Sequence, residues 1–500
     1  MTVSTKEIEA KYEASSDVTM PSFDELPQVA STVGPVEHEL TAEYFDTEDL
    51  RLIRAGITLR RRIGGEDAGW HLKLPVGPQA REEIRLPLGR GAGQVPRKLA
   101  ELVRSRTRSR PLVPIASIAT VRRMTTLLDQ CGRSLAEIAD DQVTARGYGA
   151  DQSASQWREV EVELTGGNRG LLADADSVLR RAGLHPAGRS AKLERVFGDR
   201  LPAPGRTEAL TADTPAGLVI VAFLRTQAET LKSLDPAVRR NEPDAVHQMR
   251  VTTRRLRSAL RSFQRIISGT GRLAGELQWL GGVLGEARDA EVQAERLMRH
   301  IKKTDRANLL GPVQERVEGH FAKSRSTALA KVRTALNSER YYALLDELDA
   351  VVADAPRGQQ AEASAGPLLA ASLRGSFRKA KRRFRAAQRA SGQAREVALH
   401  QARKAAKQAR YNAEAVSPVL GRSAVEFGAR AKKLQSVLGA YQDTVIGRQL
   451  ARAIAIKAHQ AGENTFSYGL FYGRDAADAR QLQKRAVKAW KNVERARPDR

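Results

Sequence analysis

The chain has 500 residues and a mass of 54.8 kDa, more than one hydrophobic core usually organises, so its length predicts two or three domains and excludes a single compact one. Its net charge of +25 implies an anionic partner. Residues 1–200 contain 29 basic and 29 acidic side chains, so the whole excess lies after residue 200, which excludes a uniformly basic, histone-like chain.

Cysteine content and hydropathy bear on the compartment. Cys131 is the only cysteine, which excludes a disulfide framework and a cysteine-rich zinc site. The chain begins without a basic and then apolar leader, and its longest apolar run, Ala216 to Leu224, is far shorter than the ~20 residues that cross a bilayer. We therefore expect a soluble cytoplasmic protein with no membrane partner.

Hydrophobic periodicity divides the chain. Short runs of period two, typical of strands, extend to about residue 200, and a helical period of 3.6 follows from about residue 215. We predict an α+β protein of two domains with the second one duplicated. The predicted boundaries are a strand domain at 1–200, a linker at 201–214 and a helical domain at 215–500, with halves at about 215–354 and 367–500.

Charged residues alternate with apolar ones in the strand domain. In the first strand Glu7, Glu9 and Lys11 share one face, opposite Ile8 and Ala10. One such strand is typical of an ordinary sheet with a wet face, but the pattern recurs and groups Arg60 with Arg62, His71 with Lys73, Arg81 with Glu83 and Arg85, and Glu159 with Glu161 and Glu163. Such a sheet either lies open on helices or closes into a barrel with a charged lumen.

The two kinds of charge suit different ligands. Glu7, Glu9, Glu159 and Glu161 offer the hard oxygen atoms that Mg²⁺ or Mn²⁺ prefers. Lys11, Arg60, Arg62, Lys73 and Arg85 offer the donors that phosphate oxygens need. Because confined charges are costly without partners, a metal-bound polyanion would satisfy both sets.

An ordered series of segments resembles the CYTH or triphosphate tunnel metalloenzyme superfamily over roughly residues 3–197. The segments are the Glu-x-Glu-x-Lys opening at Glu7, Tyr44-Phe-Asp46-Thr47, Leu59-Arg60-Arg-Arg62, His71-Leu-Lys73-Leu-Pro75, Glu159-Val-Glu161-Val-Glu163 and Ser190-Ala-Lys192-Leu. The resemblance implies an antiparallel eight-stranded tunnel with peripheral helices, which binds a linear triphosphate with one or two divalent ions. Water then attacks a terminal phosphoryl group, whereas ATP cyclises in adenylyl cyclase members.

The resemblance also implies residue roles. Metal would be held by Glu7, Glu9, Glu159 and Glu161, with Glu163 as an additional lumen acid, and the catalytic set would be Glu7, Glu9 and Lys11. Phosphate would be held by Lys11, Arg60, Arg62, Lys73, Arg85, Arg122 and Lys192, with Asp141 as a late acidic partner. Because neighbouring residues of a strand face opposite ways, only one of Arg122 and Arg123 can face the lumen, and only one of Asp140 and Asp141. Which member of each pair faces the lumen stays open.

The helical domain contains an internal repeat. His247, Arg250, Arg254 and Arg257 have the same spacing as His400, Arg403, Lys407 and Arg410, at an offset of 153 residues. About thirty residues later, Leu284-Gly285-x-x-x-Asp289 matches Leu438-Gly439-x-x-x-Asp443 at an offset of 154. Two matches at nearly one offset predict a duplicated helical unit.

Each repeated stripe lies on one face of a helix, and a basic stripe cannot be buried unpaired. It must face solvent, an acidic helix or a bound anion. Residues 374–410 contain 13 basic residues and one acidic one, Glu396, so local salt bridges cannot balance the charge. A solvated basic face is the alternative. The two histidines lack metal-ligand spacing and suit phosphate as hydrogen-bond donors. Asp289 and Asp443 either orient the cations across a helix interface or are ordinary surface residues.

This half resembles the CHAD domain, over about residues 215–500. The resemblance implies two four-helix bundles related by a pseudo-twofold axis, a basic groove that binds inorganic polyphosphate, and docking on polyphosphate granules. The implied polyphosphate-binding residues are His247, Arg250, Arg254, Arg257, His400, Arg403, Lys407 and Arg410. The second copy has Gln442 where the first has Arg288, so we expect it to bind more weakly.

Nucleic acid is the physical competitor, since a row of cations attracts any phosphate polymer. Residues 374–410 contain no recognised RNA or DNA module, which argues against specific nucleic-acid binding. The leading hypothesis is a tunnel triphosphatase that depends on Mg²⁺ or Mn²⁺, tethered to a polyphosphate-binding domain. The alternatives are a polyphosphate-binding adaptor without turnover and a tunnel that cyclises ATP.

Overall fold

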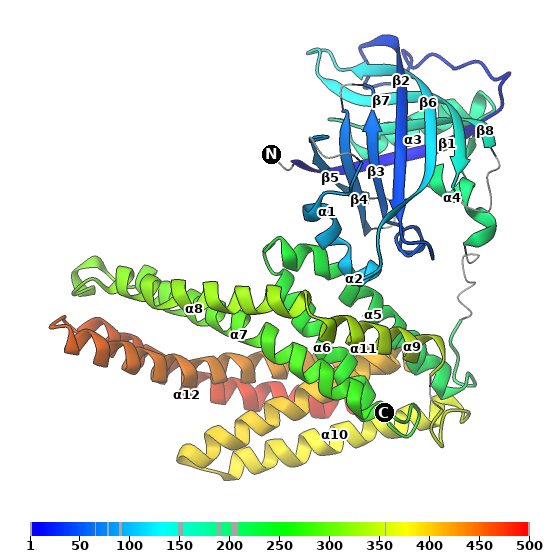
Figure 1. Cartoon of the computed structure of the whole chain (residues 1–500). Coiled ribbons are helices and arrows are strands. Elements are labelled where there is room, and N and C mark those ends of the chain that lie inside the picture. Colours follow the sequence, from blue (N-terminus) through cyan, green and yellow to red (C-terminus); the bar gives the residue numbers. More distant parts are fainter. Residues whose placement is uncertain are drawn as a thin grey trace. The chain divides into compact units, whose positions relative to one another are not determined.

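The computed structural model describes residues 3–65, 67–77, 80–89, 93–148, 154–187, 192–201, 209–355 and 357–498, without the side chains of residues 3–7 and 199. The chain divides into two compact units, Met1–Arg206 and Thr207–Arg500, and each is described by itself (Figure 1). Within the described ranges, none of the helices has the length and apolar character needed to span a bilayer.

The first unit is a closed antiparallel barrel. Eight strands pair in the order β5-β4-β3-β2-β6-β7-β8-β1, and β1 closes the ring because Val3–Ile8 pairs with β5 while Glu9–Ala14 pairs with β8. The strands are β1 (Val3–Ala14), β2 (Ser31–Asp46), β3 (Thr58–Ile63), β4 (Gly69–Gly77), β5 (Ala80–Leu86), β6 (Val113–Leu128), β7 (Ser134–Gly147) and β8 (Ala154–Leu164), with the short β9 (His185–Pro186) added beside β1. The predicted eight-stranded antiparallel barrel is confirmed, and the open sheet is not formed.

Much of the hydrophobic core of this unit lies outside the barrel. Tyr12 and Val160 point outward and pack under α3 (Arg169–Arg181), and the Tyr12 hydroxyl donates to Asp176 at 2.9 Å. On another side, Leu72 and Ile84 pack under α1 (Arg97–Leu102), followed by α2 (Arg104–Thr107). Because alternate residues of a strand face opposite ways, this outer packing turns the charged residues inward.

An apolar layer fills one part of the barrel interior. Tyr44, Ile118 and Val143 pack there against two residues of the C-terminal segment of the unit. Leu193 lies in the first turn of α4 (Lys192–Val196), and Phe197 directly follows this helix. Leu193 is anchored in this layer, which fixes the position of the residue before it, Lys192. The remaining short elements of the unit are the 3₁₀ helices Ile53–Ala55 and Gly198–Arg200.

The second unit is entirely helical in its described part, as predicted. Its helices are α5 (Ala216–Arg239), α6 (Ala245–Ser262), α7 (Gly271–Lys302), α8 (Val313–Leu336), α9 (Glu339–Ala353), α10 (Ala365–Arg389), α11 (Gly392–Gln460) and α12 (Phe466–Arg495), with a 3₁₀ turn at Arg306–Asn308. Gly421 divides α11, because its φ of 59° interrupts the helical backbone. With this division, the two halves of the unit contain equivalent helices. Helix α5 corresponds to α10, α6 and α7 correspond to the first and second parts of α11, and α8 corresponds to α12.

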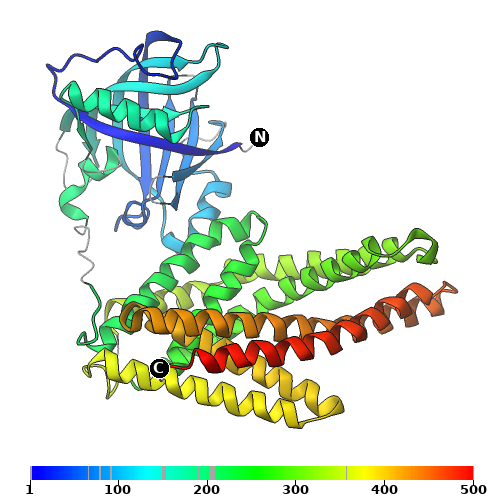
Figure 2. The same cartoon turned by 180° about the vertical axis from the view of Figure 1, so that it is seen from behind.

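The two helical series share their packing. The segments that precede α5 and α10 pair with each other, since the Ala216 amide donates to the Ala363 carbonyl at 2.9 Å and the Ala365 amide donates to the Thr214 carbonyl at 3.0 Å. One continuous core draws buried residues from both series, and a second core joins the end of α7 to α8, α11 and α12. Figure 2 shows these long helices lying side by side.

The outward core of the barrel can be tested at β4. Leu72 is fully buried under α1, whereas Val76, on the same strand, is 49% exposed. We expect Leu72→Ala to destabilise the barrel unit by about 2–5 kcal/mol, because it leaves a cavity, and the control Val76→Ala by less than about 0.5 kcal/mol. Urea unfolding of the full chain measures the difference, and equal effects would contradict this packing.

Candidate functional site

A cavity of about 430 Å³ lies inside the barrel and is lined mostly by charged and polar side chains, with Val33, Val36, Leu40, Met124 and Leu193 as its apolar lining. The predicted residues that line it are Glu9, Lys11, Arg60, Arg62, Lys73, Arg85, Arg122, Glu161, Glu163 and Lys192. Asp141 and Glu159 are buried directly beside this cavity, where both contact the Lys192 ammonium. The side chain of Glu7 lies outside the described residues.

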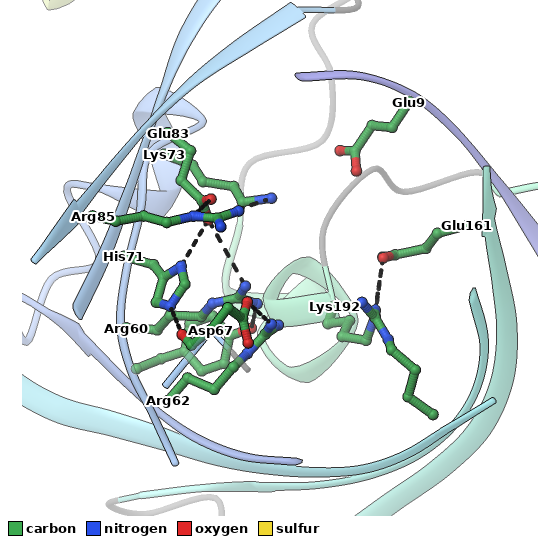
Figure 3. Close-up of polar contacts among 12 residues, drawn as sticks. Glu9, Arg60, Arg62, Asp67, His71, Lys73, Glu83, Arg85, Glu161 and Lys192 are labelled. Atoms are coloured by element: carbon green, nitrogen blue, oxygen red, sulfur yellow. Dashed lines mark hydrogen bonds and ion pairs between the residues drawn. The ribbon is translucent and has the colours of Figure 1, made fainter. Parts of the chain in front are cut away.

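One wall of the cavity is cationic and is organised around Glu83. Figure 3 shows side chains of β3, β4 and β5 gathered about this carboxylate. Glu83 accepts from His71 at 2.9 Å and forms an ion pair with Arg85, and it lies 3.8 Å from the Lys73 ammonium and 3.9 Å from an Arg60 nitrogen. Glu83 is only 1% exposed, so it is a buried counter-charge that holds the cations of this wall in place.

Asp67 extends the same network from the loop between β3 and β4. Its carboxylate accepts from Arg62 at 2.5 Å, and its carbonyl lies 2.8 Å from His71 Nε2. The pKa of Arg62 nevertheless falls to about 10, because burial and the neighbouring charge of Arg60 both disfavour its protonated form. Among the described residues named here, the four cations Arg60, Arg62, Lys73 and Arg85 outnumber the two carboxylates Glu83 and Asp67, which favours a bound anion.

The carboxyl of Glu83 responds to the same surroundings. Burial raises its pKa, but the hydrogen bond from His71 and the charges of Lys73 and Arg60 outweigh burial and hold the pKa well below its usual range. Glu83 is therefore ionised at neutral pH.

The opposite wall is acidic and comes from β1, β7 and β8. Lys192 Nζ lies among three carboxylates, at 2.6 Å from Glu159, 2.8 Å from Asp141 and 3.0 Å from Glu161. Lys11 donates to Glu161 at 2.5 Å. Figure 3 shows Glu9, Glu161 and Lys192 across the cavity from the cationic wall.

Arg122 completes the acidic wall. Its guanidinium donates to both oxygens of Asp141, at 2.7 and 2.6 Å, and to Glu161 at 2.9 Å. Burial raises the pKa of Glu161, but the charges of Lys11 and Lys192 outweigh burial and hold that pKa well below its usual range. Burial lowers the pKa of Lys192, but the charges of Glu161 and Asp141 outweigh it and raise that pKa. Arg122, Glu161 and Lys192 are therefore charged at neutral pH.

The acidic wall contains a set of possible metal ligands. Ligand atoms of Asp141, Glu159 and Glu161 lie within 4.8 Å of one another, and carboxylate oxygens suit Mg²⁺ or Mn²⁺. The donor set fits such an ion in chemistry and spacing. The Lys192 ammonium now balances these carboxylates, so an ion held by all three would replace its charge.

A second concentration of charge lies in the helical unit, where the two repeated stripes meet. Arg250 on α6 donates to Asp289 on α7 at 2.9 Å, and its guanidinium lies against Gly285, where an added Cβ would come within 3.2 Å of a terminal nitrogen. The Arg403 guanidinium lies against Gly439 in the same way, at 3.5 Å. The glycine of each Leu-Gly-x-x-x-Asp segment therefore makes room for the first arginine of a stripe.

Arg254 and Lys407 lie in this central cluster with Arg250 and Arg403. Burial, and after it the charges of Arg254, Arg403 and Arg250, together lower the pKa of Lys407 to about 6. The Nε atoms of Arg250 and Arg403 are buried and have no hydrogen-bond partner. Unpaired buried donors and crowded cations indicate a site for an anion.

The outer members of the stripes have protein partners instead. Arg257 donates to Gln278 at 2.6 Å, and Arg410 donates to Glu414 at 2.7 Å and to Gln435 at 3.2 Å. The histidines differ between the copies. His400 Nδ1 lies 3.1 Å from Gln442, whereas the buried Nδ1 of His247 has no partner.

Comparison with known families decides the identity of both units. A CYTH domain matches residues 5–185, and a CHAD domain matches residues 222–452. The chain is a CYTH–CHAD protein. The CYTH family is a triphosphate tunnel metalloenzyme family with triphosphatase and cyclase members.

The chain is also similar to several other proteins. Two uncharacterized proteins from strains of Mycobacterium tuberculosis are each 37% identical over 505 residues, covering 98% of this chain and 96% of theirs. Among solved structures, PptA from Streptomyces chartreusis matches 56% of this chain and 100% of its own, with 18% identity and a TM-score of 0.47. The CHAD domain from the plant Ricinus communis matches 58% and 96%, with 26% identity and a TM-score of 0.44.

The CYTH barrel also settles which of two adjacent residues faces inward. Arg122 and Asp141 lie on the inner side, where they pair with each other. Arg123 forms an exposed ion pair with Glu37 at 3.1 Å on the outer side. Asp140 also points outward, but it is buried and accepts two hydrogen bonds from Arg158. Neither position could be assigned from alternation alone, because each pair of neighbours carries the same charge.

Sequence reasoning missed several residues of the CYTH cavity. Glu83 was placed on the charged face but given no role, although it is the centre of the cationic wall. Asp67 is in a loop, so no strand pattern could indicate it. Asp141 is predicted as an acidic partner of substrate, and its proximity to Glu159 and Glu161, which alternation within one strand could not indicate, adds a possible role as a metal ligand. The other cavity residues without a predicted role include His38, Tyr44, Arg81 and Glu137.

The counter-charge role of Glu83 predicts a large loss of stability in Glu83→Gln. Removing this carboxylate leaves buried cations uncompensated, so we expect a loss of about 3–5 kcal/mol at pH 7, against less than about 1 kcal/mol for Glu37→Gln, whose ion pair is exposed. The lowered pKa of Glu83 means that its contribution is fully present above the ordinary glutamate pKa of 4.5 and declines as the pH falls below it.

Urea unfolding of the full chain at pH 7 and at pH 3 measures both effects. The gap between wild type and Glu83→Gln should narrow at pH 3. A gap that widens on acidification would show that Glu83 is not a stabilising carboxylate.

Proposed function

We propose that the CYTH barrel hydrolyses inorganic triphosphate, or a related triphosphate, with Mg²⁺ or Mn²⁺, and that the CHAD unit binds inorganic polyphosphate. The observation that carries the catalytic part is the separation of charge within one cavity, where a cationic wall faces a carboxylate triad. A linear triphosphate that carries a divalent ion is complementary to both walls.

The cationic wall would bind the phosphate chain. Arg60, Arg62, Lys73 and Arg85 come from three adjacent strands and are held by Glu83 and Asp67 before any ligand arrives. Cations fixed in this way stabilise developing phosphate charge without a reorganisation cost at the moment of reaction. Positioning and charge stabilisation account for most catalysis of phosphoryl transfer, so no nucleophilic side chain is needed.

The acidic wall would hold the ion. Asp141, Glu159 and Glu161 are the ligands that the structure favours, with Glu9 and Glu163 as further acids on the cavity wall. A bound divalent ion would neutralise phosphate charge and polarise a phosphoryl oxygen. Lys11 and Lys192, which now pair with these carboxylates, would then be available to phosphate oxygens. In the reaction, a water oxygen bonds to a terminal phosphorus while the bond to the bridging oxygen breaks.

Polyphosphate binding is supported by the central cluster of the CHAD unit. Arg250, Arg254, Arg403 and Lys407 approach one another from α6 and α11, and the nearest described acids are the exposed Asp289 and the half-buried Asp443. The pKa of Asp443 is raised by burial, although the charge of Arg403 opposes this. A polyanion would supply the charge that these acids do not.

Adjacent residues of β6 give a matched test of catalysis. Arg122 faces the cavity and Arg123 faces outward. We expect Arg122→Ala to lower kcat/KM for tripolyphosphate with Mg²⁺ or Mn²⁺ by roughly 10²–10³-fold, because a fixed donor to the phosphate is lost, and Arg123→Ala to leave it unchanged.

Phosphate release measures the rate, and Arg122→Lys, which keeps the charge, checks that any loss does not come from unfolding. Cyclic AMP as the product from ATP would replace the proposal with a cyclase. Tight binding with no turnover in the wild type would favour the adaptor instead.

The lowered pKa of Lys407 predicts that polyphosphate affinity depends on pH. With a pKa of about 6, Lys407 is mostly neutral at pH 8 and gains its charge as the pH falls, so affinity should rise from pH 8 to pH 6. Lys407→Arg stays charged throughout, so it should bind more tightly than the wild type at pH 8 and show a flatter profile.

The pKa values of His247 and His400 are also lowered, by burial first, so a variant with both histidines changed to Asn serves as the control for their titration. Calorimetric titration at several pH values measures the profiles. Identical profiles for the wild type and Lys407→Arg would contradict a role for Lys407 in the pH dependence.

A further inference from the structure

Helix α10 carries a concentration of positive charge that the central cluster does not include. It contains eight lysine and arginine residues between positions 374 and 389 and no acidic residue along its whole length. Its apolar side, including Phe377 and Phe384, is buried in the core, and the basic residues lie on the rest of the helix, where all are exposed except the half-buried Arg374 and Lys381. We call this surface the α10 face, and its members are Arg374, Arg378, Lys379, Lys381, Arg382, Arg383, Arg385 and Arg389.

The arginines of the α10 face are not balanced by acids. Within the described part of the chain, Arg378, Arg382, Arg383, Arg385 and Arg389 have no acidic partner, and all five are exposed. Residues four apart on a helix are neighbours, so pairs such as Arg378 with Arg382 and Arg385 with Arg389 repel each other. The face is therefore electrostatically unfavourable for the helix alone, and a bound polyanion would relieve it.

The internal duplication supplies a comparison within the same molecule. Helix α5 occupies the corresponding position in the first series, and the segments before α5 and α10 pair as equivalents. Yet α5 has three basic residues and two acidic ones, Glu229 and Asp235. The fold of the unit therefore does not require a basic helix at this position, and the charge of α10 needs another explanation.

The α10 face is connected to the central cluster through α11, which contacts α10 and carries Arg403 and Lys407. Lys379 Nζ donates to Gln408 on α11 at 2.8 Å, and Gln408 directly follows Lys407. Figures 1 and 2 show α10, in yellow, at the edge of the helical unit in both views. The stretch from Arg374 to Arg389 is about 22 Å long at the helical rise, which suits an extended ligand rather than a single phosphate group.

From these observations we propose that the α10 face is a second binding surface for inorganic polyphosphate, which chains contact when they extend beyond the central cluster. This inference rests on the proposed function of the CHAD unit and adds a contact for long chains. A phosphate polymer without bases is favoured over nucleic acid, because both aromatic residues of α10 are buried and none is available to stack on a base.

The test compares three variants of the full chain, each with cations replaced by Gln, which preserves helix propensity. The first changes Arg382, Arg383, Arg385 and Arg389. The second removes the same number of charges at four exposed residues of α7, its C-cap and α8, namely Lys302, Lys303, Lys323 and Arg325. The third changes Arg254 and Lys407 in the central cluster.

The affinity of each variant for long-chain polyphosphate, and for an RNA homopolymer as a comparison, is measured over a range of salt concentrations. We expect the α10 variant to lose roughly tenfold in affinity and to show a shallower salt dependence, because fewer counterions are released. The variant on α7 and α8 should stay near wild type, and the α10 variant should keep its melting temperature and its rate on tripolyphosphate.

The outcomes separate the two claims. Equal affinities for the α10 variant and its matched control, together with weaker binding by the central-cluster variant, would overturn the α10 inference alone. Unchanged binding by the central-cluster variant would overturn the proposed central site. A loss confined to an RNA homopolymer, with polyphosphate binding intact, would assign the α10 face to nucleic acid and contradict the inference.

Discussion

Closing an eight-stranded barrel forces every second side chain of each strand into one confined space. In most small barrels apolar residues fill that space, whereas here a large share of them pack outside against α1 and α3. The interior charges must then balance one another or balance a ligand, because unpaired charges in such a space are costly. The pairing of Glu83 with the cationic wall and of Lys192 with the carboxylate triad both follow from this constraint.

Because cations and acids are concentrated on opposite walls, the interior can bind the anionic and cationic parts of one ligand at different places. If acids and bases were mixed evenly, each would neutralise its neighbour and the cavity would be only a rigid network. Strands β3 to β5 instead contribute mostly cations, and β1, β7 and β8 contribute mostly acids. A ligand with anionic phosphates at one side and a bound cation at the other satisfies both walls, whereas a simple anion or a lone metal ion satisfies one.

The CHAD unit meets a related constraint in a different way. Its cations are carried on helices, so they can crowd together only where a neighbouring helix lacks a side chain. Gly285 and Gly439 provide that space for Arg250 and Arg403. The duplication then brings two such stripes together, which explains why the same spacing occurs twice in the sequence. The exposed charge of α10 has no counterpart on α5, so duplication does not explain it.

Strand alternation and the repeat made much of this predictable. Alternation identified the inward faces of β1, β3, β4, β5 and β8, since each shows charges at every second position. It failed for Arg122 and Asp141, because their neighbours carry the same charge. The register of β6 with β7 puts Arg122 on the same face as Asp141, and the contact of Arg122 with Glu161 shows that this face is the inner one. Strand alternation also cannot predict contacts between segments that are distant in the sequence. The position of Lys192 among three carboxylates depends on how Leu193 packs, and Asp67 depends on a loop.

The inward charges of the barrel are complementary to a metal-bound triphosphate. A crystal structure of the protein with tripolyphosphate and Mn²⁺, using the anomalous signal of manganese, would locate both ligands. We expect manganese beside Asp141, Glu159 and Glu161, and phosphate groups against Arg60, Arg62 and Lys73. Manganese and phosphate located only on the outer surface, with Lys192 still among the three carboxylates, would contradict this complementarity.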